Sequence, residues 1–113
     1  MTSAFATLVV EGGAARALVR REHLHALCEG HFPGQPILPG AYLAGLMAEV
    51  AVTLLGSDRT LAEVERCTFL HRVTPDDPVT VTAVADGPAR ARTEVHTRGV
   101  CAARAVLRFE TTR

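Results

Sequence analysis

The chain has 113 residues, of which 48% are hydrophobic and only 4% aromatic, and it contains no tryptophan. This length is enough for one hydrophobic core and too short for two, so we expect a single domain over residues 1–113 with an interior of Ala, Val and Leu. The 12 basic residues, all of them arginine, balance the 12 acidic ones, which removes the electrostatic case for nucleic-acid binding.

The sequence also argues against secretion and membrane insertion. Its N-terminus lacks the basic region of a signal peptide, and its odd number of cysteines, three, does not suit a disulfide framework. The longest apolar stretch, residues 37–55, is interrupted by Pro39, Gly40, Gly45 and Glu49, and therefore falls short of a membrane span. We expect a cytoplasmic protein that does not enter a membrane.

The first third of the chain predicts a hairpin followed by an irregular segment. Residues 4–10 (AFATLVV) and 14–20 (AARALVR) are short β-like runs around Glu11-Gly12-Gly13, a typical hairpin signal. Residues 22–40 show no periodicity and contain three prolines and three glycines, so we expect an irregular segment there.

One strong helix is predicted over residues 41–55. Apolar residues recur there at helical spacing, and Gly56 follows as a terminator. Ala51 and Val52 extend the apolar surface around most of the circumference, which indicates a buried helix. The periodic positions are Leu43, Leu46, Met47, Val50 and Leu54.

The rest of the chain predicts strands. Residues 61–73, 79–85, 91–99 and 100–111 alternate apolar with polar side chains, as half-buried antiparallel strands do. One buried helix with five or six strands indicates the α+β class. We expect a hot-dog fold, in which an antiparallel sheet wraps around one central buried helix, and we expect it to form an oligomer.

The segment GHFPGQPILPG, residues 30–40, carries the clearest functional signal. Three prolines and three glycines fix an irregular backbone in one shape, and His31 is its only titratable side chain. Pro39-Gly40 then leads into the start of the predicted helix, where unpaired amides can polarise an oxygen. A base at one end and amide donors at the other suit removal of a proton next to a carbonyl.

This pattern resembles that of a known enzyme family. His-Phe-Pro-Gly-x-Pro-x-x-Pro-Gly over residues 31–40, ahead of a buried helix, is similar to the signature of the (3R)-hydroxyacyl-acyl-carrier-protein dehydratases, the FabA/FabZ-like hot-dog dehydratases. The resemblance extends to the order of elements over nearly the whole chain, including Phe69 and the turn Val73-Thr74-Pro75-x-Asp77.

The resemblance implies a dehydratase whose site needs two chains. His31 would be the general base that removes the α-proton of a β-hydroxyacyl thioester, and the amide of Gly40 or Ala41 would bind the thioester carbonyl. The acyl chain, on the phosphopantetheine of acyl carrier protein, would run along a dimer interface. No metal or organic cofactor is implied, because the thioester itself acidifies the α-carbon. The substrate-binding residues would be Phe32, Gly34, Gly40, Ala41, Tyr42 and Gly45.

The sequence departs from the family pattern at the catalytic acid. The family places Glu or Asp fourteen residues after the histidine, where this chain has Gly45. Glu49 lies one helical turn further along the same face. Three readings remain: Glu49 reaches back and acts as the acid, a homologous partner chain supplies it across a heterodimer interface, or the chain has lost catalysis and only binds acyl thioesters or supports a partner. A homodimer would leave the role to Glu49.

Other functions and sites are also considered. A hot-dog thioesterase is the alternative enzyme, and a non-catalytic acyl-thioester-binding subunit the alternative outside enzymes. Cys28 and His31 are too few ligands for a structural zinc site, and His71 and His96 are expected at the surface or at an edge. An acidic carrier protein could meet a rim of four arginines, Arg20, Arg21, Arg66 and Arg72.

Overall fold

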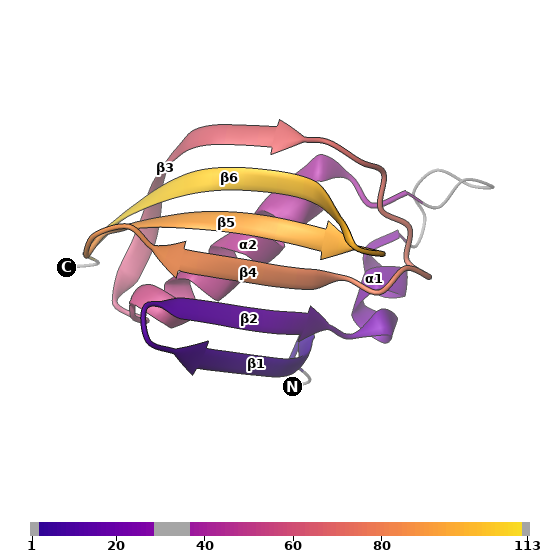
Figure 1. Ribbon diagram of the computed structural model, residues 1–113, viewed down its shortest axis with the longest axis horizontal. Coiled ribbons are helices and arrows are strands. Elements are labelled where there is room, and N and C mark those ends of the chain that lie inside the picture. The colour runs from indigo at the N-terminus through magenta and orange to yellow at the C-terminus, as the bar shows by residue number, and fades with distance from the viewer. Residues whose placement is uncertain (1–2, 29–36, 112–113) are drawn as a thin grey trace.

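A computed structural model describes residues 3–28 and 37–111. Its strands form one antiparallel sheet in the order β1-β2-β4-β5-β6-β3. Figure 1 shows this sheet as a curved layer with α2 running obliquely behind it, which confirms the predicted hot-dog fold. In chain order the elements are β1 (Phe5–Glu11), β2 (Ala14–Val19), α1 (Arg21–Cys28), α2 (Gly40–Leu55), β3 (Arg59–Phe69), β4 (Thr80–Ala85), β5 (Arg90–Thr97) and β6 (Val100–Thr111).

The core lies between α2 and the inner face of the sheet. The helix contacts strands β2 to β6, and Met47, Val50 and Ala51 are completely buried. Alternate residues of the strands point at it, because successive strand side chains face opposite sides of a sheet. The fully buried inner-face residues of β2, β4 and β5 are Ala17, Val81, Ala83, Ala91 and Val95.

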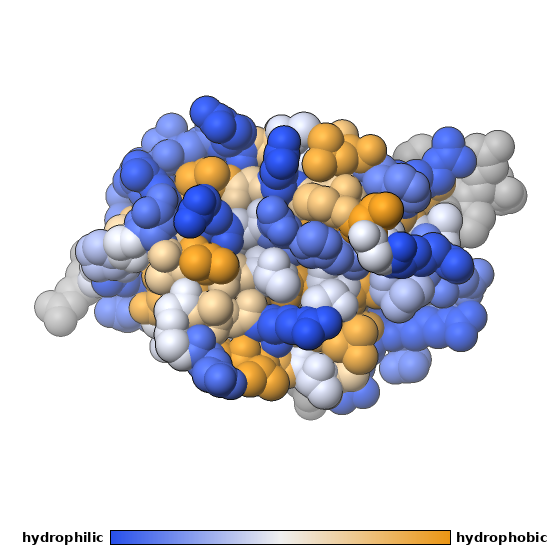
Figure 2. All heavy atoms as spheres, viewed as in Figure 1, coloured by the Kyte–Doolittle hydropathy of each residue, from blue (hydrophilic) through white to orange (hydrophobic). Residues whose placement is uncertain are grey.

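The opposite face of the sheet is mixed. Figure 2 shows it in the same view, with hydrophilic and hydrophobic residues interspersed over the strands. This pattern agrees with the predicted alternation of half-buried strands. None of the helices in residues 3–28 and 37–111 has the length and apolar character needed to cross a membrane.

Three segments differ from the prediction by two residues or more, and the first is the strand expected over residues 61–73, which runs from Arg59 to Phe69. Residues 22–40 were expected to be irregular, but Arg21–Cys28 form helix α1. Leu24 and Cys28, four residues apart, bury its inner side, and the glycines and prolines of the segment all come after it. The predicted strand 91–99 ends at Thr97, because Arg98 and Gly99 adopt φ values of 51° and 79° and form a two-residue hairpin turn.

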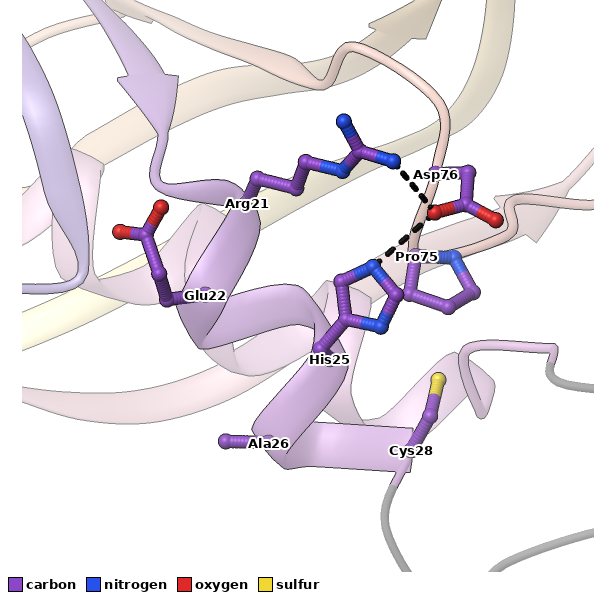
Figure 3. A pocket seen from close by; sticks show the side chains of 7 residues that line it. All are labelled: Arg21, Glu22, His25, Ala26, Cys28, Pro75 and Asp76. Atoms are coloured by element: carbon purple, nitrogen blue, oxygen red, sulfur yellow. Dashed lines mark hydrogen bonds and ion pairs between the residues drawn. The ribbon is translucent and has the colours of Figure 1, made fainter.

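The turn between β3 and β4 is held by two aspartates. Asp77 accepts hydrogen bonds of 3.0 Å from the backbone amide and the hydroxyl of Thr74, and Arg98 donates to it from the β5–β6 turn. Asp76 accepts from Arg21 at 2.8 Å and contacts His25 at 3.0 Å (Figure 3). The β3–β4 turn is thereby tied to the β5–β6 hairpin and to α1.

The two glycines of α2 occupy different surroundings. A Cβ on Gly40 would lie 2.8 Å from Cζ of the Phe69 ring, whereas a Cβ on Gly45 would meet nothing within 4 Å. Gly40 therefore allows an aromatic ring to pack directly on the backbone at the start of the helix. No packing among residues 3–28 and 37–111 requires glycine at position 45.

The glycine substitutions should have opposite effects on stability. Gly45→Ala should raise the free energy of unfolding by up to about 1 kcal/mol, because glycine disfavours the helix interior. Gly40→Ala should lower it by about 1 kcal/mol, because the Phe69 ring must move. Urea denaturation of the purified protein measures both. In a Phe69→Leu background the Gly40→Ala cost should largely disappear; an unchanged cost would show that the ring is not its origin.

Asp77 should contribute stability that depends on pH. The Arg98 guanidinium, with the amide and hydroxyl of Thr74, holds the pKa of Asp77 below its ordinary value. The contribution is therefore fully present above about pH 3.9, the pKa of an aspartate in the unfolded chain. It is lost as the pH falls through the lower pKa that Asp77 has in the folded chain.

Asp77→Asn should cost about 1 kcal/mol of unfolding free energy at pH 7 and progressively less below about pH 4. Denaturation curves across this range test it, with the exposed Asp86→Asn as the matched control; equal pH dependence in both variants would contradict it.

Candidate active site

The start of α2 presents backbone donors that find no acceptor inside the helix. The amides of Tyr42 and Leu43 donate to the carbonyl of Pro39 at 3.0 and 3.3 Å. The two preceding amides, of Gly40 and Ala41, have no acceptor within the helix, because the first turn of a helix leaves its N–H groups unpaired. They lie at the positive end of the helix dipole, which favours an oxygen carrying negative charge.

A hollow surrounds this helix end. Its volume is about 460 Å³, and it lies between the start of α2 and the segment that follows β3. Phe69, 52% exposed, forms one wall over Gly40, and Arg72 lies among the other residues that line it. Gly40, the first of the two residues predicted to bind the carbonyl, therefore borders a space that is open from outside.

The exposed side of α2 is one narrow stripe. Ala41, Gly45, Glu49 and Thr53 are the exposed residues of this helix, each four positions after the last. Glu49 is thus on the same face as Gly45, about 6 Å further along the axis. No other part of the described chain covers this stripe, so it is available to a second chain.

Tyr42 lies beside the stripe rather than on it. It is partly buried and packs against the hydrophobic core. The structure therefore gives Tyr42 a packing role, and its contact with an acyl chain stays a prediction.

The predicted base, His31, lies outside the described residues, as do Phe32 and Gly34. Both flanks of their segment are nevertheless fixed. Cys28 is buried at the end of α1, and the amide of Leu38, also buried, donates to the carbonyl of Val73 at 2.8 Å.

A second hollow, of about 700 Å³, adjoins the first flank. Figure 3 shows Arg21 and His25 of α1 reaching Asp76 across it, with Cys28 at its lower side. Burial raises the pKa of the Cys28 thiol, so this thiol is mainly protonated near neutral pH and is a poor nucleophile or metal ligand. At the rim of this hollow, Asp76 fastens α1 ahead of the His31 segment through its contacts with Arg21 and His25.

Two features of this region were not found from the sequence. The contact between Gly40 and Phe69 joins residues 29 positions apart, and no local pattern reports it. The Asp76 bridge depends on α1, which was not predicted. The spacing of Arg21 and His25 at i and i+4 was the available signal, since such residues share one face of a helix.

Several known dehydratases are similar to this chain in sequence. The 3-hydroxyacyl-[acyl-carrier-protein] dehydratase FabZ of a Ruegeria species is 36% identical over 58 residues, which cover 43% of this chain and 36% of that protein. The FabZ of Alkaliphilus metalliredigens is 28% identical over 92 residues, covering 72% of this chain and 63% of that protein. The chain thus spans about a third to under two thirds of the length of these relatives.

Solved structures share the fold at low sequence identity. The dehydratase heterocomplex ApeI:P from Xenorhabdus doucetiae aligns with a TM-score of 0.81 over 96% of this chain and 98% of that chain, at 18% identity. The uncharacterized protein PH1136 from Pyrococcus horikoshii gives 0.75 over 96% and 83%, at 13% identity. These likenesses concern the fold alone.

The family itself is shown by a match along the sequence. The model of the ApeI-like family, described as ApeI dehydratase, matches residues 10–104, which include the His31 motif, all of α2 and most of the sheet. This match, with the FabZ relatives, confirms the resemblance to hydroxyacyl-thioester dehydratases. The chain belongs to the ApeI-like dehydratase family.

Proposed function

We propose that the chain is one subunit of a heteromeric dehydratase that converts a β-hydroxyacyl thioester on acyl carrier protein into the trans-2-enoyl thioester, in fatty-acid or polyketide biosynthesis. The observation that carries this proposal is the exposed stripe of α2. At the family's acid position it has Gly45, with open space around it. The chain thus offers one half of a catalytic pair and a free surface for the other half.

The reaction divides between the two chains. His31 takes the proton from the α-carbon, and the amides of Gly40 and Ala41 stabilise the negative charge that moves onto the thioester oxygen. The electron pair then moves back from the thioester oxygen and forms the double bond between the α- and β-carbons. The bond from the β-carbon to its hydroxyl breaks, and the leaving hydroxyl takes a proton from an acid to become water.

The acid is best supplied by the partner chain. Gly45 has no proton to donate, and Glu49 is a full helical turn away on an exposed surface. The dehydratase heterocomplex ApeI:P, named as an assembly of two components, shares the fold of this chain. In such an assembly the partner's central helix would bring its carboxyl group opposite His31.

The edge of the sheet beside α2 is suited to hold that partner. Within the described part of the chain β3 pairs with β6 alone, and it is exposed along nearly its whole length. Leu61 and Val64 on it are more than two fifths exposed, so an unpaired strand edge with apolar side chains is available for a partner to cover. β3 also contacts α2, so one partner can cover both elements.

The carrier protein would meet the arginines that remain free. Arg21 is paired with Asp76, and Arg20 donates to the backbone carbonyl of Ser3. Among the described residues, Arg66 and Arg72 have no acidic partner within ion-pair distance and are exposed. Arg72 also lines the hollow at the start of α2, so it is the better placed of the two to attract an acidic carrier.

Replacing the base tests the activity directly. In the assembly purified from its native host, His31→Ala should lower the rate of enoyl-thioester formation by at least about 100-fold, because a positioned general base contributes that much or more. Mass spectrometry of the acyl carrier protein measures the product. Unchanged turnover would identify a non-catalytic subunit, and released thiol in place of enoyl product would identify a thioesterase.

Three substitutions on α2 locate the acid. In the native assembly, Glu49→Gln should change the rate by less than about threefold, whereas loss of a true general acid costs about 100-fold or more. In the chain assembled with itself, Gly45→Glu should raise activity at least about tenfold by placing an acid opposite His31 of the second copy. Gly45→Gln, similar in size but unable to donate a proton, is the matched control. Collapse of activity in Glu49→Gln would assign the acid to Glu49 and remove the need for a different partner.

A further inference from the structure

Three side chains with metal-binding atoms meet on the outer face of the sheet. Glu94 and His96 lie on β5 and Cys101 lies on β6, and their ligand atoms are all within 4.8 Å of one another. We propose that these three residues form a zinc site, separate from the active site. It is independent of the proposed dehydratase function.

An irregularity in β6 brings the cysteine to this position. The β5–β6 register pairs Val95 with Ala103 but His96 with Cys101, so Ala102 is an extra residue on β6. Ala102 and Ala103 are therefore both turned into the core and completely buried. Without this bulge the alternation of the strand would point Cys101 inward; with it, Cys101 shares the outer face with Glu94 and His96.

The donor atoms match the preferences of zinc. Imidazole nitrogen, thiolate sulfur and carboxylate oxygen are its usual protein ligands, and three of them leave a fourth position for water. Magnesium and calcium prefer oxygen ligands. Tetrahedral zinc places a nitrogen and a sulfur ligand about 3.5 Å apart, so the present separations need only small side-chain rotations.

The existing contacts would change in a defined way when the ion binds. His96 Nε2 lies 2.7 Å from a Glu94 carboxylate oxygen, and Cys101 Sγ lies 3.4 Å from the carbonyl of Ala103. Zinc would replace the protons that these contacts share, since a bound thiol and imidazole nitrogen are deprotonated. Carboxylate and thiolate together would neutralise the ion.

The surroundings leave the site accessible. The side chains of His96 and Glu94 are 38% and 46% exposed, so an ion can reach them. Arg104 on β6 is the register partner of Glu94, and Arg92 lies two residues before Glu94 on the same face. Arg66 on β3 lines a hollow together with both of these arginines. These three are the neighbouring cations, and an ion that its two anionic ligands neutralise adds no further positive charge beside them. The helix α2, with Gly45, is on the other side of the sheet.

Cobalt spectroscopy tests the site, because Co²⁺ takes the place of zinc and absorbs visible light. The full chain, with any subunit that co-purifies, is freed of metal, reduced and titrated with Co²⁺. One Co²⁺ ion should bind per chain. It should give a sulfur-to-cobalt charge-transfer band and the visible bands of tetrahedral cobalt, and Zn²⁺ should abolish both. If the unmodified protein shows neither band, the proposal is overturned.

The three cysteines supply matched controls. Cys101→Ser should remove the charge-transfer band, while Cys28→Ser and Cys67→Ser, in thiols whose pKa values burial raises, should leave it intact. Glu94→Gln and His96→Ala should each weaken cobalt binding at least about tenfold, with circular dichroism confirming the fold. A band that survives Cys101→Ser, or that is lost with Cys28→Ser or Cys67→Ser instead, would overturn the assignment.

Discussion

The burial of α2 against the sheet is the constraint on which the rest of the structure depends. Met47, Val50 and Ala51 leave no surface to water, and strands β2 to β6 all contact the helix. A helix held this way cannot rotate without exposing apolar side chains. Its orientation fixes two things at once: the free amides at its first turn, and the single exposed stripe that carries Gly45 and Glu49.

The main elements of the fold could be predicted because their periodicity is long and regular. The helix over 41–55 and the alternating runs after residue 60 came within a few residues of α2, β3, β4, β5 and β6. Helix α1 was missed because eight residues give too short a window for a helical period. The segment was also judged together with the prolines and glycines that follow it. The turn at Arg98 was missed because an arginine with positive φ leaves no signal in composition.

The candidate site was predictable only where its residues are close in sequence. The amides at Gly40 and Ala41 and the missing acid at Gly45 follow from local order and spacing. The ring of Phe69 over Gly40 depends on how β3 packs beside α2. The position of Cys101 on the outer face beside His96 depends on a one-residue irregularity that alternation cannot report. His31 itself stays a prediction from its motif.

The contact between Phe69 and Gly40 links two positions that are distant in the sequence. A Cβ at position 40 would lie 2.8 Å from a carbon of the Phe69 ring, so a larger residue at position 40 requires the ring to move or to be replaced by a smaller side chain. Among relatives, a residue larger than glycine at position 40 should accompany a residue smaller than phenylalanine at position 69. The wall beside the Gly40 amide is in this sense a two-residue unit.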